Sequence, residues 1–166
     1  REIRKMAAEL PYNPKSGNLV RLDYLRKFGY YVTESSEHNA EYNPFYIKNK
    51  YPELIEKYNI PLDEYPRRCV DQIALWDKQK EKIFAGGEVT HTRSKEYASR
   101  IMEAIVTDTP YKMNASVINN GLIPNLPAEA CVEVPCMVDG TGINPVYVGE
   151  LPLHLAAMNI SNITPQ

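Results

Sequence analysis

The spacing of apolar residues changes character along this chain. In the first part, apolar residues recur every three or four positions, which predicts helices; these cover residues 1–10, 19–28, 51–58, 68–84 and 94–106. Further on, short apolar or alternating runs bounded by turn residues predict strands; these cover residues 115–119, 131–138 and 145–148. A last apolar run starts a helix near residue 151. Helices followed by strands, without strand–helix–strand alternation, predict an α+β fold.

Residues with special backbone preferences mark some of these boundaries. Asn18 can cap the helix over 19–28, and Gly29 stands where a left-handed residue commonly follows a helix. Within the predicted strand 131–138, Pro135 has no amide hydrogen to donate. That residue predicts an edge strand or a bulge.

Length and charge narrow the classes of function. A chain of 166 residues predicts one domain, 1–166, with a real hydrophobic core. A net charge of -2 gives no support for binding nucleic acid or an anionic membrane, and no apolar run reaches the roughly 20 residues of a membrane span.

The chain has three cysteines, Cys69, Cys131 and Cys136, and this odd number suggests neither a disulfide framework nor a zinc ribbon. The expected compartment is therefore the reducing cytoplasm. Because the chain begins at Arg1 without Met, inside a predicted helix, we expect it to be a piece of a longer protein.

The polar, aromatic run over residues 31–46 is the main candidate for a functional site. It holds three carboxylates, a histidine that titrates near neutral pH and several phenols. That inventory suits a carbohydrate site or a metal-assisted site. The alternative is solvated carboxylates, a structural His38 and tyrosines that belong to the core. His38 and Glu41 would share a helix face and could start an autonomous metallohydrolase site, but a metal needs a third ligand and none is adjacent.

Two positions outside this run can also contact a ligand. Arg93 lies with Glu96 at the start of a predicted helix, which suits an anion or sugar hydroxyls; the alternative is a capped helix with exposed charges. Asn119 precedes Asn120-Gly121, and this group is most simply explained as turn chemistry. The chain has no glycine-rich phosphate loop and no GxSxG elbow, so these residues alone do not predict a Rossmann-type dinucleotide site.

Three blocks of sequence together resemble a known family. They are FGYYVTESSEHNAEY at 28–42, RSKEYAS at 93–99, and NNGLIPNLP at 119–127 continued by VEVPC at 132–136 and VGELP at 148–152. In order and spacing these blocks are similar to the C-terminal half of glycoside hydrolase family 4, in its α-galactosidase/α-glucosidase branch. The resemblance covers nearly the whole chain. It implies part of a lactate-dehydrogenase-like C-terminal domain, in which helices are followed by a small antiparallel sheet.

The same resemblance implies a redox mechanism of glycoside hydrolysis. Family 4 uses NAD and a divalent metal, typically Mn²⁺, in place of the usual carboxylate pair. Hydride leaves C3 of the sugar for NAD, a base removes the acidified C2 proton, and the glycosidic oxygen is eliminated; water then adds and the hydride returns. The metal polarises the sugar oxygens at C2 and C3.

Much of this machinery is expected outside the chain. In the family, the NAD-binding Rossmann domain and the cysteine and histidine metal ligands precede the point at which these residues begin. The resemblance therefore implies neither cofactor-binding nor metal-ligating residues here. We expect residues 1–166 to be inactive alone, to need the N-terminal Rossmann domain, to supply one wall of a pocket for an α-glycoside and to take part in homo-oligomer contacts.

The resemblance leaves the individual roles open. The C2 base is a Tyr or an Asp in family members, and its candidates in this chain are Tyr31, Glu34, Glu37 and Tyr42. Substrate contacts are expected from Ser35, Ser36, His38, Arg93 and Asn119. The acidic charge of the run over 31–46 favours an unphosphorylated sugar over a 6-phospho-α-glycoside, which would need a cationic clamp. A non-catalytic binding or oligomerisation module is the other alternative.

Overall fold

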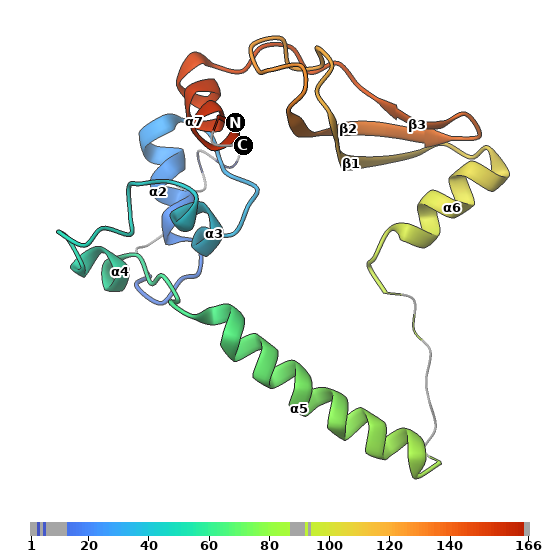
Figure 1. Ribbon diagram of the computed structural model, residues 1–166, viewed down its shortest axis with the longest axis horizontal. Coiled ribbons are helices and arrows are strands. Elements are labelled where there is room, and N and C mark those ends of the chain that lie inside the picture. The colour runs from blue at the N-terminus through green and yellow to red at the C-terminus, as the bar shows by residue number, and fades with distance from the viewer. Residues whose placement is uncertain (1–2, 4, 6–12, 87–91, 93, 165–166) are drawn as a thin grey trace. The chain divides into compact units, whose positions relative to one another are not determined.

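A computed structural model of the protein describes residues 3, 5, 13–86, 92 and 94–164 (Figure 1). The chain divides into two compact units, Arg1–Thr90 and His91–Gln166. The predicted helix over 1–10 and the residue Arg93 lie outside the described residues, apart from two positions of that helix. Whether the two units form the single predicted domain stays a prediction.

The first unit is helical. Its described elements are α2 (Leu19–Phe28), α3 (Ser36–Glu41), α4 (Glu53–Lys57) and α5 (Glu64–Phe84). The end of α2 is as predicted, because Gly29 adopts φ 80° and donates its N–H to the Leu25 carbonyl. At the other end Asn18 makes no capping bond to the backbone, and its side chain instead accepts from Arg21 Nη1 at 3.1 Å.

Aromatic side chains form the core around α2 and α3. Tyr24 and Tyr46 are almost completely buried, and their ring centroids lie 5.8 Å apart. Tyr46 donates its hydroxyl hydrogen to Asp23 Oδ2 at 2.7 Å, and the same oxygen accepts from Lys27 Nζ at 2.7 Å. Burial raises the pKa of Tyr24 to about 12. The first unit is therefore held by tilted aromatic rings around one partly buried polar anchor.

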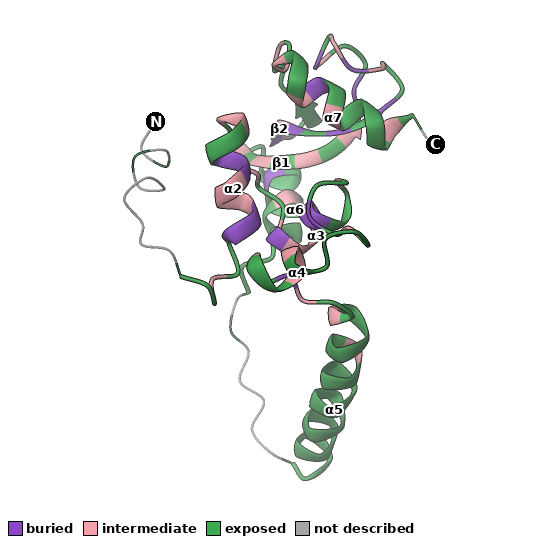
Figure 2. Cartoon of the chain, turned by 90° about the vertical axis from the view of Figure 1, so that its left-hand side faces the viewer, coloured by how far each residue is buried: buried purple, intermediate pink, exposed green. Residues whose placement is uncertain are grey.

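Helix α5 starts four residues before the predicted boundary at 68. Pro66 is its third residue, and a proline in the first turn breaks no helical bond because that N–H has no partner inside a helix. Figure 2 shows α5 as almost entirely exposed. An apolar stripe runs along it, and it includes Tyr65, Val70, Ile73, Trp76, Ile83 and Phe84.

The second unit contains an antiparallel sheet. Its described elements are α6 (Ala98–Thr107), β1 (Tyr111–Ile118), β2 (Cys131–Asp139), β3 (Gly142–Pro145) and α7 (Leu153–Ile163), and the strand order is β1-β2-β3. Both pairings are antiparallel (Figure 1). Helices followed by this small sheet confirm the predicted α+β fold.

One face of the sheet carries the core of the second unit. In β2 the residues Val132, Val134, Cys136 and Val138 alternate inward and are buried, as the sequence pattern predicted. Ala156 of α7 belongs to the same apolar cluster. The sheet and α7 thereby enclose one continuous core, and α6 also contacts the sheet.

The prediction that Pro135 marks an edge strand or a bulge is wrong. Pro135 lies in the central strand, in regular register with Asn114 of β1. On the β3 side, its carbonyl accepts from Val146 N at 2.8 Å. A regular pair would return a second bond from residue 135, and proline has no N–H to donate. The ladder of β3 consequently ends at Pro145, so the predicted strand over 145–148 is also wrong.

The remaining boundaries shift by a few residues. The predicted helix over 94–106 begins at Ala98, and the predicted strand over 115–119 begins at Tyr111. None of the described helices has both the length and the apolar character that crossing a membrane requires.

Candidate functional site

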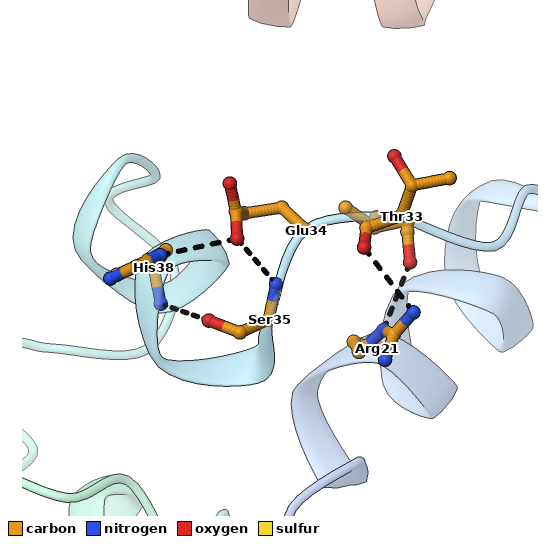
Figure 3. Close-up of polar contacts among 6 residues, drawn as sticks. Arg21, Thr33, Glu34, Ser35 and His38 are labelled. Carbon is orange, nitrogen blue, oxygen red and sulfur yellow. Dashed lines mark hydrogen bonds and ion pairs between the residues drawn. The ribbon is translucent and has the colours of Figure 1, made fainter. Parts of the chain in front are cut away.

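The run over 31–46 folds into a loop that leads into α3. Ser35 caps this helix, because its extended backbone lets Oγ accept from His38 N at 3.2 Å. Glu34 lies just before the cap, and its Oε1 accepts from Ser35 N at 2.7 Å (Figure 3). The first turn of α3 is therefore fixed by two side chains of the predicted site.

Glu34 and His38 form a pair on the surface. Glu34 Oε1 lies 3.1 Å from His38 Nδ1 (Figure 3). The backbone bond from Ser35 and then the bond to His38 hold the pKa of Glu34 below its usual value. The bond to Glu34 in turn raises the pKa of His38. Both shifts favour the charged forms, so this carboxylate is a weak proton acceptor.

Arg21 of α2 anchors the start of the run. Its Nε donates to the Val32 carbonyl at 2.9 Å, and Nη2 donates to the Thr33 carbonyl at 3.4 Å (Figure 3). Its guanidinium lies over the ring of Tyr31, 4.4 Å from the centroid. Ser36 is buried, and its Oγ accepts from Arg21 N at 3.4 Å. Tyr31 and Ser36 thus connect the run to α2.

A cavity of about 240 Å³ lies between α3 and the start of α5. Its lining is polar, and consists of Glu37, His38, Glu41, Asp63, Glu64, Tyr65, Pro66 and Arg68. Two predicted site residues, Glu37 and His38, therefore share one hollow. A hydrogen bond that the protonated Glu37 carboxyl donates to the neighbouring Glu64 carboxylate, followed by burial, raises the pKa of Glu37. Glu37 is thus the predicted base candidate whose surroundings favour accepting a proton.

The sequence did not predict the contribution of α5 to this cavity. Glu64 precedes the predicted helix over 68–84, and Arg68 is the first residue of that helix. A cluster of acidic and aromatic residues at 63–65, next to prolines, was the available signal. Only the fold brings this cluster beside α3, about 25 positions earlier in the chain.

The other predicted contacts lie elsewhere. Tyr42 is exposed, with its ring centroid 6.1 Å from that of His38. Asn119 is completely buried, and its Nδ2 donates to the carbonyls of Ile123, Leu126 and Pro127 at 2.9 to 3.0 Å. Its Oδ1 accepts from Ile123 N at 2.7 Å. This geometry stabilises the loop after β1 and leaves no polar atom of the side chain for a sugar.

The described residues do not form a metal site. Across 13–86 and 94–164, no three His, Cys, Asp or Glu side chains come together as a metal ion requires. His38 and Glu41 both line the cavity, but a third ligand for an autonomous site is lacking among these residues. The described part of the chain therefore supplies no complete metal site of its own.

Comparison with known proteins identifies the chain. A model of the family 4 glycosyl hydrolase C-terminal domain matches residues 2–166. The chain belongs to glycoside hydrolase family 4. An alpha-galactosidase of Bacillus subtilis is 53% identical to this family 4 chain over 165 residues, which are 99% of the chain and 38% of that protein. The resemblance carried by the three sequence blocks is thereby confirmed.

Solved structures share the fold. The protein lplD of Bacillus subtilis covers 98% of the chain with a TM-score of 0.80 at 20% identity, over 39% of its own length. A 6-phospho-alpha-glucosidase from gut microorganisms, solved in complex with NAD and Mn²⁺, also covers 98% of the chain, with a TM-score of 0.61 at 20% identity, over 39% of its length. The family 4 chain therefore spans about two fifths of the length of these relatives.

Proposed function

We propose that the protein carrying this chain is an α-galactosidase that works by the NAD- and Mn²⁺-dependent route of family 4. The polar cavity beside α3, in a chain 53% identical to an alpha-galactosidase, is the observation that carries this proposal. The solved relative with NAD and Mn²⁺ supports the choice of cofactors. No three His, Cys, Asp or Glu side chains of the described residues come together, so we assign the Mn²⁺ site to other parts of the protein. The NAD site is assigned to the N-terminal Rossmann domain that the family resemblance implies.

This chain then supplies one wall of the sugar pocket. Carboxylates and His38 around the cavity can accept hydrogen bonds from sugar hydroxyls, and Arg68 can donate them. The cavity is about eight times the roughly 30 Å³ that one water occupies in the liquid. It is smaller than the roughly 300–1,000 Å³ typical of drug-sized ligands, which suits part or all of a single sugar ring.

Among the four base candidates, we assign the removal of the C2 proton to Glu37. Glu34 is engaged by Ser35 and His38, and the ring of Tyr31 lies under a guanidinium. Glu37 lines the cavity, and the adjacent Glu64 carboxyl raises its pKa toward the range in which a general base is effective. Its proposed role is to take one proton from the sugar and return it later.

The test uses the full-length protein and p-nitrophenyl α-galactoside. Turnover is measured with and without NAD, Mn²⁺ and reductant, and we expect it to require both cofactors. Glu37→Gln is expected to lower kcat by about 10²- to 10⁴-fold, the usual contribution of a general base. Glu53→Gln, an exposed residue of α4 outside the cavity, is the matched control. Turnover without NAD would overturn the mechanism, and an active Glu37→Gln variant would return the assignment to Tyr31, Glu34 or Tyr42.

The compartment and the oligomeric state of the enzyme belong to the same proposal. We place the enzyme in the cytoplasm, in keeping with three free cysteines, and we expect a homo-oligomer. Size-exclusion chromatography with light scattering on the full-length protein tests the second point.

A further inference from the structure

Helix α5 exposes its apolar stripe along its whole length. None of its 21 residues, all of which the structure describes, is buried (Figure 2). The three aromatic members of the stripe, Tyr65, Trp76 and Phe84, are 77%, 58% and 81% exposed. An aromatic side chain offers about 150–250 Å² of surface, so these rings alone leave roughly 300–500 Å² open to solvent. Apolar patches of more than a few hundred Å² mark interaction surfaces.

The centre of this stripe follows a seven-residue repeat. Its two series are Cys69, Trp76 and Ile83, and Pro66, Ile73 and Lys80. Two series of this kind, offset by three and four residues, form the seam along which helices pair in a coiled coil. Lys80 is the one charged member of this seam. The repeat therefore favours a second helix as the occupant of the stripe.

The position of Lys80 favours an antiparallel arrangement of two copies of α5. In a parallel pair of identical helices equivalent residues face each other, so two Lys80 ammonium groups would meet in the seam and repel. In an antiparallel pair whose two-fold axis passes between residues 74 and 75, Lys80 faces Cys69 of the partner subunit. In the same register Ile73 faces Trp76 of the partner subunit. Two-fold symmetry makes each of these contacts twice, so the seam is complementary to itself.

We propose that two copies of the protein associate through α5, which packs antiparallel against α5 of the second copy. This inference rests on the homo-oligomer of the proposed function, because it names the surface that forms it. A stable interface buries about 800 Å² on each partner; the three rings supply roughly half of this area, and Val70, Ile73 and Ile83, each more than half exposed, add to it. The charges of α5 nearly cancel, with five basic and four acidic residues. Tyr65 also lines the cavity between α3 and α5, so the interface reaches the edge of the proposed sugar pocket.

The test is a disulfide cross-link in the full-length protein. Lys80→Cys places a thiol opposite Cys69 of the partner subunit, and facing residues of helices about 8–10 Å apart come within the Cα separation that a disulfide requires. Under mild oxidation we expect a band of twice the chain mass on a non-reducing gel. Adding Cys69→Ser to the same variant should abolish this band. Lys78→Cys, on the opposite side of α5, is the matched control because it has the same number of cysteines.

A second measurement is the mass of the full-length protein by size-exclusion chromatography with light scattering. Trp76→Glu is expected to halve the wild-type mass, because it places a carboxylate in the seam against Ile73 of the partner subunit, whereas Leu75→Glu, exposed on the other side of α5, should keep it. If wild type is an oligomer but Lys80→Cys cross-links no more than Lys78→Cys, the inference is overturned and the proposed oligomer stands. A monomeric wild type, in which another part of the protein covers the stripe, would overturn both. Turnover of p-nitrophenyl α-galactoside tests the proposed enzyme separately.

Discussion

The Nδ1 atom of His38 lies 3.1 Å from the Oε1 atom of Glu34, and each group shifts the other toward its charged form. This contact couples the loop before α3 to the first turn of the helix. The acidic residues of the run over 31–46 therefore differ in their surroundings. Glu34 is engaged with its neighbours, whereas Glu37, three residues on, lines the cavity.

The first prediction concerns this pair. Glu34→Gln is expected to lower the pKa of His38 toward its ordinary value of 6.5, because the main cause of the raised pKa is lost. The measurement is an NMR titration of the imidazole resonances in the full-length protein, with Glu53→Gln as control. A His38 that titrates at the same pH in both variants would show that the pair is absent in solution.

The same pair gives a pH dependence of stability. The contribution of His38 is complete below its ordinary pKa of 6.5 and is lost as pH rises through the higher folded value. The contribution of Glu34 is present above its ordinary pKa of 4.5 and is lost as pH falls through the lower folded value. The pair therefore stabilises most between these two pH values. Both side chains are about half exposed, so the expected difference between wild type and Glu34→Gln in thermal unfolding is small.

The second prediction concerns Asn119. Asn119→Ala removes four hydrogen bonds and leaves the Ile123 N–H and three carbonyls without this partner, and we expect a loss of roughly 2–4 kcal/mol in unfolding free energy. Denaturant unfolding measures this loss, and hydrogen exchange at the Ile123 amide reports it locally. Asn114→Ala, on the exposed side of β1, is the control and should change stability by less than about 0.5 kcal/mol. Equal effects of the two substitutions would contradict the structural role.

The third prediction concerns the turn between β2 and β3. Gly140 N donates to Asp108 Oδ1 at 2.8 Å, and a Cβ at residue 140 would lie 2.7 Å from that oxygen. Gly140→Ala is therefore expected to destabilise the protein by about 1–3 kcal/mol. Asp108 has φ 54°, a conformation glycine adopts easily, so Asp108→Gly removes the clash without backbone strain. In a double-mutant cycle the combined variant should lose less stability than the sum of the two single variants; strict additivity would rule out the clash.

The fourth prediction concerns the aromatic core. Tyr46→Phe removes the 2.7 Å bond to Asp23 and leaves that carboxylate with the Lys27 ion pair. Bonds to charged groups contribute roughly 1.5–3 kcal/mol, so we expect a destabilisation of that size. Tyr97→Phe, at a half-exposed ring, should have little effect in the same denaturant experiment. A Tyr46→Phe variant with an unchanged unfolding free energy would mean that water replaces the lost hydrogen-bond partner of Asp23.

Local rules predicted those parts of the fold that depend on a few neighbouring residues. The end of α2 at Gly29 and the inward alternation of β2 follow from backbone freedom and from a period of two. The start of α5 was missed because Pro66 suits a connection and a first helical turn equally well. The prediction for Pro135 failed because a central strand also tolerates a missing N–H at the point where the neighbouring strand ends, as β3 does beside residue 136.

The candidate site was predictable only in part. Residue types in the run over 31–46 indicated Glu37 and His38, since carboxylates and imidazole suit carbohydrate chemistry. That Glu64 lies beside Glu37 depends on how α5 returns to α3, which no local pattern contains. Asn119 looked like ordinary turn chemistry, and its burial is a property of the folded loop.

The missing amide hydrogen of Pro135 also decides where the chain goes next. After Pro145 the backbone leaves the sheet, and the N–H groups of Val148 and Gly149 both donate to the Leu122 carbonyl. Leu122 belongs to the loop that the Asn119 side chain stabilises. The segment after Pro145, which does not pair with β2, therefore supports that loop. A residue with an N–H at position 135 could donate a second bond to residue 146 and lengthen the sheet in the same register. Proline cannot donate that bond, which favours the path on which Val148 and Gly149 bond to Leu122 instead.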